Sequence, residues 1–270
     1  MNSPKQGCNL MKKFKTSQPI IIGLAGKAGS GKTSVAEQIV PKGSFAEKKF
    51  GTYWDHIFFA LPLYELASIR RSIKGFNEDN RQLYAIHEVL FDIYGGSSLG
   101  IIPPYQEFID KVNALHQLPI ESEGTKPRSF LQKAGDICRD GREDCFAMWG
   151  IMKASKLYRS YYKSLEEDSV EHPFAVIISD VRFANEAEAI LKQPNGIVVC
   201  FDASKETLQD RIYKRDGLLM SGEQLSHKSE QEIMQVMSMA SVIINTDNMS
   251  IEDQTLETLK QIGLLQEQNA

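Results

Sequence analysis

Cysteine is scarce in this chain of 270 residues, and no two cysteines form a C-x-x-C pair. Four cysteines in a chain of this length do not indicate a disulfide framework. Cys200 stands in an apolar run and is predicted to be a thiol of the core, while the other three are Cys8, Cys138 and Cys145. This cysteine usage predicts a reducing, cytoplasmic setting.

Long apolar runs and a strong charge of one sign are also missing. No stretch approaches the roughly 18 consecutive apolar residues of a membrane span, so no contact with a membrane is expected. The formal net charge of −4 gives no general attraction to nucleic acid, and any contact with DNA or RNA would have to be local. The apolar fraction of 42% and the charged fraction of 24% are ordinary for a globular protein.

Residues 1–18 contain four lysines and no acid, but no apolar segment of about 7–15 residues follows them. A secretory signal is therefore not expected. We interpret these residues as a mobile basic tail. The sequence contains no internal repeat and no low-complexity segment.

The most specific motif is a glycine-rich segment that matches G-x-x-x-x-G-K-[ST] at every fixed position, between an apolar run and a helical pattern. Its glycines let successive N–H groups point into one concavity, where they bind phosphate oxygens. Lys32 can then reach the β- and γ-phosphates, and the Thr33 hydroxyl can ligate Mg²⁺. The alternative is a chance glycine-rich turn. The motif predicts an ATP site made of Gly26, Lys27, Ala28, Gly29, Ser30, Gly31, Lys32 and Thr33.

Five short apolar segments are typical of buried strands, and helical patterns lie between them. This alternation predicts an α/β fold with a parallel sheet that is covered on both faces. We expect one domain over residues 19–265, with a large helical insertion at about 62–170. The predicted strands are Ile20–Ala25, His56–Ala60, Ala175–Ser179, Ile197–Phe201 and Val242–Asn245.

An acid follows the third predicted strand, where P-loop enzymes place the group that holds Mg²⁺ through water or positions the nucleophile. We predict this role for Asp180, and we expect Arg182 to reach a phosphate. The structural alternative is that Asp180 caps the next helix, with Asn185 and Glu186 on its exposed first turn.

A basic cluster follows the fourth predicted strand. Arg211 and Arg215 are four residues apart and share one face of a helix, and a glycine follows that could act as a hinge. Phosphoryl transfer needs cations over the transferring group, and a closing lid supplies them. We therefore predict a lid at about residues 211–228. The alternative is a solvated helix end, paired with Asp210 and Asp216.

Within the helical insertion, Arg128, Gln132 and Arg139 lie near one helical stripe. A monophosphate acceptor needs a bidentate cation for its phosphate and an amide that can pair with a base edge. Together with Arg182, these three residues form the predicted acceptor site, although such residues are often ordinary surface residues. The segment Phe59–Leu63 could line an acceptor pocket, but the core is favoured for it.

With these motifs, the sequence resembles the bacteriophage-type deoxynucleoside monophosphate kinases from about Ile20 to Ile262. The most diagnostic segment begins at Asp180 and reads DVRFANEA. The insertion around Phe76–Thr125 is longer than in such kinases, which leaves the preferred base open and admits modified pyrimidines. The resemblance rests on Gly26–Thr33, Phe59–Leu63, Leu131–Gly135 with Arg139, Asp180–Glu188 and Arg211–Gly217.

The resemblance implies a three-layer P-loop kinase fold with five parallel strands in the order 2-3-1-4-5. It also implies the reaction, in which the γ-phosphoryl group of Mg·ATP passes to a deoxynucleoside monophosphate. The implied catalytic groups are Lys32, Asp180, Arg211 and Arg215. The resemblance also implies that Arg128 or Arg139 binds the phosphate of the acceptor.

Two other functions stay open at this level. One is a P-loop kinase of another acceptor, either a small metabolite or a modified base in DNA. The other is a P-loop NTPase that is not a kinase, although such proteins normally end the relevant strand in two adjacent acids, and only Asp180 is present here. A homodimer is also left open.

Overall fold

The computed structural model describes residues 18–40, 47–49, 52–73, 77–96, 102–120, 127–165, 172–217 and 231–265, which form two compact units. The sheet unit takes the described residues up to His56, those of 154–217 and those of 231–265. The helical unit takes the described residues of 57–153. The prediction of a single domain with an insertion at about 62–170 stays a prediction.

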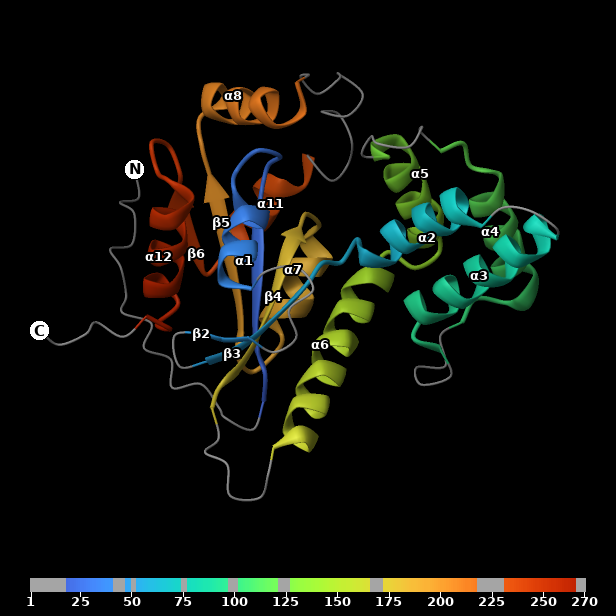
Figure 1. Ribbon diagram of the computed structural model, residues 1–270, viewed down its shortest axis with the longest axis horizontal. Helices are drawn as coiled ribbons and strands as arrows, with labels where there is room; N and C mark the ends of the chain where they lie inside the picture. Colours follow the sequence, from blue (N-terminus) through green and yellow to red (C-terminus); the bar gives the residue numbers. More distant parts are fainter. Residues whose placement is uncertain are drawn as a thin grey trace, which may run out of the picture. The chain divides into compact units, whose positions relative to one another are not determined.

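A six-stranded sheet forms the centre of the sheet unit (Figure 1). Its order is β2-β3-β4-β1-β5-β6, and β1 pairs in parallel with both β4 and β5. Without β2, the other five strands stand in the predicted order 2-3-1-4-5, so the predicted α/β fold is confirmed. The strands are β1 (Ile20–Gly26), β2 (Glu47–Lys49), β3 (Thr52–Ile57), β4 (Phe174–Val181), β5 (Gly196–Asp202) and β6 (Val242–Asn245).

Two details differ from the sequence prediction. The second predicted strand begins earlier, at Thr52, and ends at Ile57, because a turn follows and a helix starts at Leu61 with Pro62 in its first turn. Trp54, which is fully buried, belongs to this strand although polar residues flank it. The prediction also missed β2, a charged three-residue strand that pairs antiparallel with β3.

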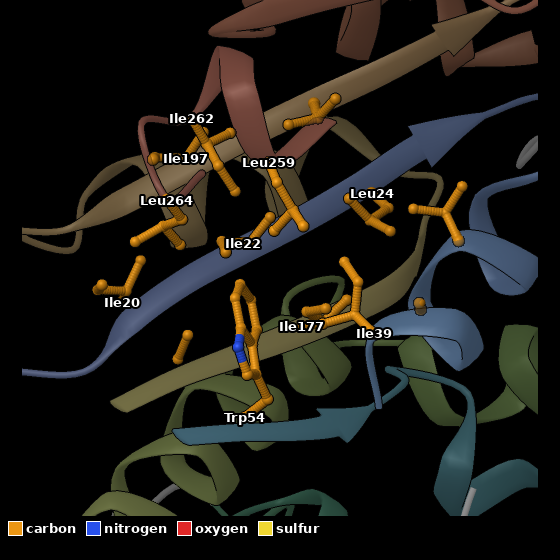
Figure 2. Packing of buried hydrophobic residues seen from close by; sticks show 14 of the residues in the cluster. Ile20, Ile22, Leu24, Ile39, Trp54, Ile177, Ile197, Leu259, Ile262 and Leu264 are labelled. Atoms are coloured by element: carbon orange, nitrogen blue, oxygen red, sulfur yellow. The ribbon is translucent and has the colours of Figure 1, made fainter. Parts of the chain in front are cut away.

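Helices cover the sheet because β1, at its centre, is buried along its whole length and must be packed on both faces. On one face, Ile20, Ile22 and Leu24 of β1 share a core with Ile39 and Leu259 (Figure 2). On the other face, α7 packs against β1 and β5, and α11 packs against α7. The helices are α1 (Lys32–Ile39), α7 (Ala184–Leu191), α8 (Lys205–Asp216), α11 (Ile233–Met239) and α12 (Ile251–Gln261).

The helical unit is built from amphipathic helices whose apolar residues recur every three or four positions and are buried between neighbours. Helix α2 packs against α3 and α5, and α4 packs against α3 and α5. Helix α6 belongs to this unit up to Lys153 and continues into the sheet unit. The helices are α2 (Leu61–Ser72), α3 (Glu78–Ile93), α4 (Tyr105–Gln117), α5 (Arg128–Arg139) and α6 (Cys145–Ser164). In the part of the chain that the structure describes, no helix could span a bilayer.

Candidate active site

The loop between β1 and α1 has the backbone shape that the glycine motif predicts. Gly26, Gly29 and Gly31 all have positive φ, at 142°, 84° and 96°, where side chains with a Cβ are rare. The surroundings also exclude a side chain. A Cβ on Gly26 would lie 2.6 Å from the carbonyl oxygen of Phe201, and one on Gly29 would lie 2.8 Å from that of Leu208. The loop is therefore a tightly curved backbone segment with no room for side chains at Gly26 and Gly29.

The N-terminus of α1 opens onto this loop without a side-chain cap. Gly31 is its N-cap residue, and its first turn contains no acid, so the first amide groups and the positive end of the helix dipole suit an anion. Lys32 is 5% exposed, and its Nζ donates to the carbonyl of Lys27 at 3.1 Å across the loop. Thr33 is exposed on the same turn. This arrangement fits a triphosphate with Mg²⁺ at Thr33.

Two buried polar atoms next to the loop lack a hydrogen-bond partner among the described residues: Ser30 Oγ and Gln254 Oε1. Ser30 Oγ lies 2.6 Å from the place that a Cβ on Gly26 would take, and the Gln254 carboxamide of α12 lies against Gly31. Buried polar atoms are usually paired. Their position indicates that the loop is built for polar contacts that a bound ligand or water would complete.

A bulge at the end of β4 sets the backbone of the predicted acid. The pairing of β1 with β4 shifts register between Gly23 and Ala25, where Ser179 and Asp180 together face a single residue of β1. Bulges of this kind redirect side chains and are frequent next to active sites. Asp180 is half-buried, whereas Ser179 is buried and its Oγ lies 2.7 Å from Nε2 of His56 on β3. No sequence motif links His56 with Ser179, because 123 residues separate the two.

The structural alternative for Asp180 is that it caps the next helix, α7, with Glu186 on an exposed first turn. The structure shows that the exposed position expected for Glu186 is wrong. Glu186 is not on an exposed first turn, since it is only 3% exposed. Its carboxylate accepts hydrogen bonds from the backbone N–H groups of Arg182 at 2.9 Å and Phe183 at 3.1 Å. Glu232 accepts a third, from Ala184 N at 3.1 Å. Two other acids thus satisfy these amides, and Asp180 lies in the strand before them.

Arg211 and Arg215 both lie on α8, as predicted, but they have different surroundings. Arg211 is half-buried and donates from Nη1 to Thr246 Oγ1 at 3.0 Å and from Nη2 to the Thr246 carbonyl at 2.7 Å. Arg215 is exposed. Asp210 pairs with Lys214 of the same helix end at 2.7 Å, with both side chains exposed, which fits the alternative of a solvated helix end for that part of the cluster. The predicted lid beyond residue 217 lies outside the described residues.

Thr246 connects α8 to the glycine loop, and the neighbouring Asp247 binds the start of α8. Thr246 Oγ1 lies 3.5 Å from the carbonyl oxygen of Ser30, so the residue that holds Arg211 also meets the loop. The Asp247 carboxylate accepts hydrogen bonds from Ser204 N at 3.0 and 3.1 Å. Hydrogen bonds from the Thr207 side chain and from Ser204 hold the pKa of Asp247 below its usual value. Nothing in the sequence motifs pointed to these two residues.

Three of the four predicted acceptor residues lie together on α5 of the helical unit, whereas the fourth, Arg182, directly follows β4 in the sheet unit and is half-buried. Arg128, Gln132 and Arg139 are half-buried and recur at intervals of four and seven residues, which places them on one face of the helix with Gly135. The segment at the start of α2 is core, as favoured, since Phe59 is 1% exposed and Leu63 is 4% exposed.

The site therefore belongs to an α/β protein with a glycine loop between its central strand and the first helix. No model of a known protein family matches the chain. It is 28% identical over 238 residues to a protein of Acanthamoeba polyphaga mimivirus that bears the name "Putative deoxynucleotide monophosphate kinase", covering 87% of this chain and 91% of that protein. Among solved structures, TT1252 from Thermus thermophilus is 16% identical, with a TM-score of 0.39 over 90% of this chain and 97% of that one.

Proposed function

We propose that this protein is a deoxynucleoside monophosphate kinase, which transfers the γ-phosphoryl group of ATP to a deoxynucleoside 5′-monophosphate. The observation that carries the proposal is the glycine loop: a tight, uncapped helix N-terminus with a nearly buried lysine at its mouth. The mimivirus relative, through its name, supports a nucleotide as the acceptor.

On the donor side, the backbone N–H groups of residues 26–33 and the Lys32 ammonium bind the phosphates of ATP. A Mg²⁺ ion bound with the nucleotide would neutralise the charge that develops on the phosphoryl oxygens. Thr33 would supply a hydroxyl ligand for it, and Asp180 would supply a carboxylate. Arg211 and Arg215 complete the cationic surroundings of the γ-phosphoryl group. No covalent intermediate is required, because positioning and electrostatics account for the rate enhancement.

On the acceptor side, residues of the helical unit bind the monophosphate. Arg139 or Arg128 pairs with its phosphate, and Gln132 offers both a donor and an acceptor to the base edge. The alternative role for Asp180, in place of holding Mg²⁺, is to position the phosphate oxygen of the acceptor that attacks the γ-phosphoryl group. The long helical region around residues 76–125 leaves the preferred base to experiment.

The test is a coupled ADP-release assay of the full chain with Mg·ATP and each of the four deoxynucleoside monophosphates, common modified analogues, a panel of small metabolites and oligonucleotides. ADP release that depends on a free monophosphate supports the proposal. Release that depends on a small metabolite or an oligonucleotide supports a kinase of another acceptor, and equal release with and without an acceptor supports an NTPase that is not a kinase.

Lys32→Ala is the matched perturbation, and Lys192→Ala, at an exposed position after α7, is its control. We expect Lys32→Ala to lower kcat by on the order of 10²- to 10³-fold, because it removes one preorganised cation from the transferring group. The circular dichroism spectrum should stay unchanged. Normal turnover in Lys32→Ala would contradict the assignment of the donor site.

A further inference from the structure

The side chain of Arg139 lies in a slot that two other residues create. Its Cζ atom lies 4.7 Å from the centre of the Phe146 ring, which is 1% exposed. Its Nη1 atom lies 2.7 Å from the place that a Cβ on Gly135 would occupy. Glycine in the middle of a helix of 12 residues is less favourable than alanine, so its presence needs a packing reason. The guanidinium of Arg139 fills the space that the missing Cβ leaves.

The backbone from which Arg139 projects is also held in place. The last carbonyl groups of a helix have no partner within it. Here the Tyr94 hydroxyl donates to the carbonyl of Cys138 at 2.7 Å. The buried ammonium of Lys111 donates to the carbonyls of Ile137 at 3.3 Å and of Asp140 at 2.8 Å. The C-terminal turn of α5 is therefore fixed on both sides of residue 139.

We propose that Gly135 and Phe146 are positioning residues, which fix the Arg139 guanidinium for the phosphate of the acceptor. This inference rests on the proposed function, and it assigns the acceptor phosphate to Arg139. An aromatic ring holds a guanidinium by its face, whereas the N–H donors that make bidentate contacts with phosphate lie along its edge. Fixing a long flexible side chain before binding reduces the entropy that is lost when the phosphate arrives.

The clash at Gly135 makes the proposal testable without unfolding the protein. The atom that a new Cβ would meet is the end of a flexible side chain, which can move away at little cost to the fold. Gly135→Ala should therefore displace the guanidinium and leave the helix intact. Phe146→Leu keeps an apolar side chain in the core and removes the ring face.

The kinetic experiment measures kcat and KM for the deoxynucleoside monophosphate and for ATP in both variants. We expect KM for the monophosphate to rise about 3- to 30-fold, the range that corresponds to a cation–π contact, while KM for ATP and kcat change less than about twofold. In an Arg139→Ala background neither substitution should raise KM further. Lys133→Ala, an exposed position on the same helix, is the control.

A second readout does not depend on activity. The Arg139 Nε–H resonance, assigned by its loss in Arg139→Lys, should be shifted upfield by the Phe146 ring in the full chain, and should move downfield in Phe146→Leu and in Gly135→Ala. A resonance that stays in place in both variants overturns the positioning, as does an unchanged KM. A wild-type protein that phosphorylates no deoxynucleoside monophosphate overturns the proposed function instead, and with it the acceptor that Arg139 is inferred to bind.

Discussion

Lys111 provides the strongest test of how the helical unit is held together. Its side chain is 6% exposed, and its ammonium reaches two backbone carbonyls near the end of α5 and the carboxylate of Asp140 at 3.1 Å. Lys111→Met keeps the length and the apolar stem of the side chain but removes the donor. The carbonyl of Ile137 then loses its contact in a half-buried place, whereas that of the exposed Asp140 can turn to water.

The expected magnitude follows from these contacts. A hydrogen bond from a charged donor contributes roughly 1.5–3 kcal/mol, and leaving a buried carbonyl without a partner costs about 1–3 kcal/mol. Methionine offsets part of the loss, because no charge has to be desolvated. We expect Lys111→Met to lower the free energy of unfolding by about 2 kcal/mol.

Lys192 is the matched control. Lys111 and Lys192 each pair with a glutamate four residues earlier, Glu107 at 3.6 Å and Glu188 at 3.5 Å. Lys192 is 74% exposed, and its side chain has no other hydrogen bond or ion pair with the residues that the structure describes. Lys192→Met should therefore change the free energy of unfolding by less than about 0.5 kcal/mol.

Urea unfolding measures both variants, and hydrogen exchange shows where protection is lost. Lys111→Met should reduce the protection of amides in α5, and Lys192→Met should not. Equal effects of the two substitutions, or a loss of protection confined to other helices, would refute the view that the buried ammonium holds the end of α5.

Three further predictions concern other parts of the chain. Gly150→Ala should lower the free energy of unfolding by about 1–3 kcal/mol in urea, because its Cβ would overlap the buried ring of Phe59; wild-type stability would contradict this packing. Glu186→Ala should cost about 1–3 kcal/mol, because two backbone amides at the start of α7 lose their acceptor, and full stability would show that water replaces it. Burial raises the pKa of Cys145 to about 12 and that of Cys138 further, so stability should fall as pH rises above about 8.5, where only the unfolded thiols ionise. Compared with a variant that has alanine at both cysteines, the additional slope is about 1.4 kcal/mol per pH unit for each thiol, and identical slopes in urea titrations at pH 8 to 10 would exclude this cause.

The central strands of the sheet could be located from the sequence because they carry a clear signal, whereas their order could be predicted only from the family resemblance. The strand that begins at Ile20 is apolar throughout, as a strand buried on both faces must be, and the resemblance supplied the order in which the strands lie. The start of β3 could not be predicted, because Thr52, Tyr53 and Asp55 interrupt the apolar pattern. The residue that anchors this part of the strand in the core is the buried Trp54. A three-residue strand such as β2 carries no periodicity at all.

The site divides in the same way. The glycine loop has a local pattern, because each glycine is required by the positive φ of the backbone at its own position. The contacts of Arg211 have none: its partner, Thr246, is 35 residues away and follows a different strand. The slot of Arg139 lies between these cases, since the glycine four residues earlier is visible in the sequence but acquires meaning only when the Phe146 ring is seen beside it.

The sheet order explains why residues of the proposed donor site, which are far apart in the chain, lie at one edge of the sheet. In a parallel sheet the loops at the carboxyl ends of the strands open on one edge, and β1 lies between β4 and β5 while β6 lies next to β5. The loop after β1, Asp180 in β4 and Thr246 after β6 therefore share that edge. Because Thr246 contacts both Ser30 and Arg211, the position of the α8 arginine is linked to the conformation of the glycine loop. Thr246→Val should thus impair the use of ATP more than the binding of the monophosphate, which kcat and the two KM values would show directly; a selective rise in KM for the monophosphate would contradict this link.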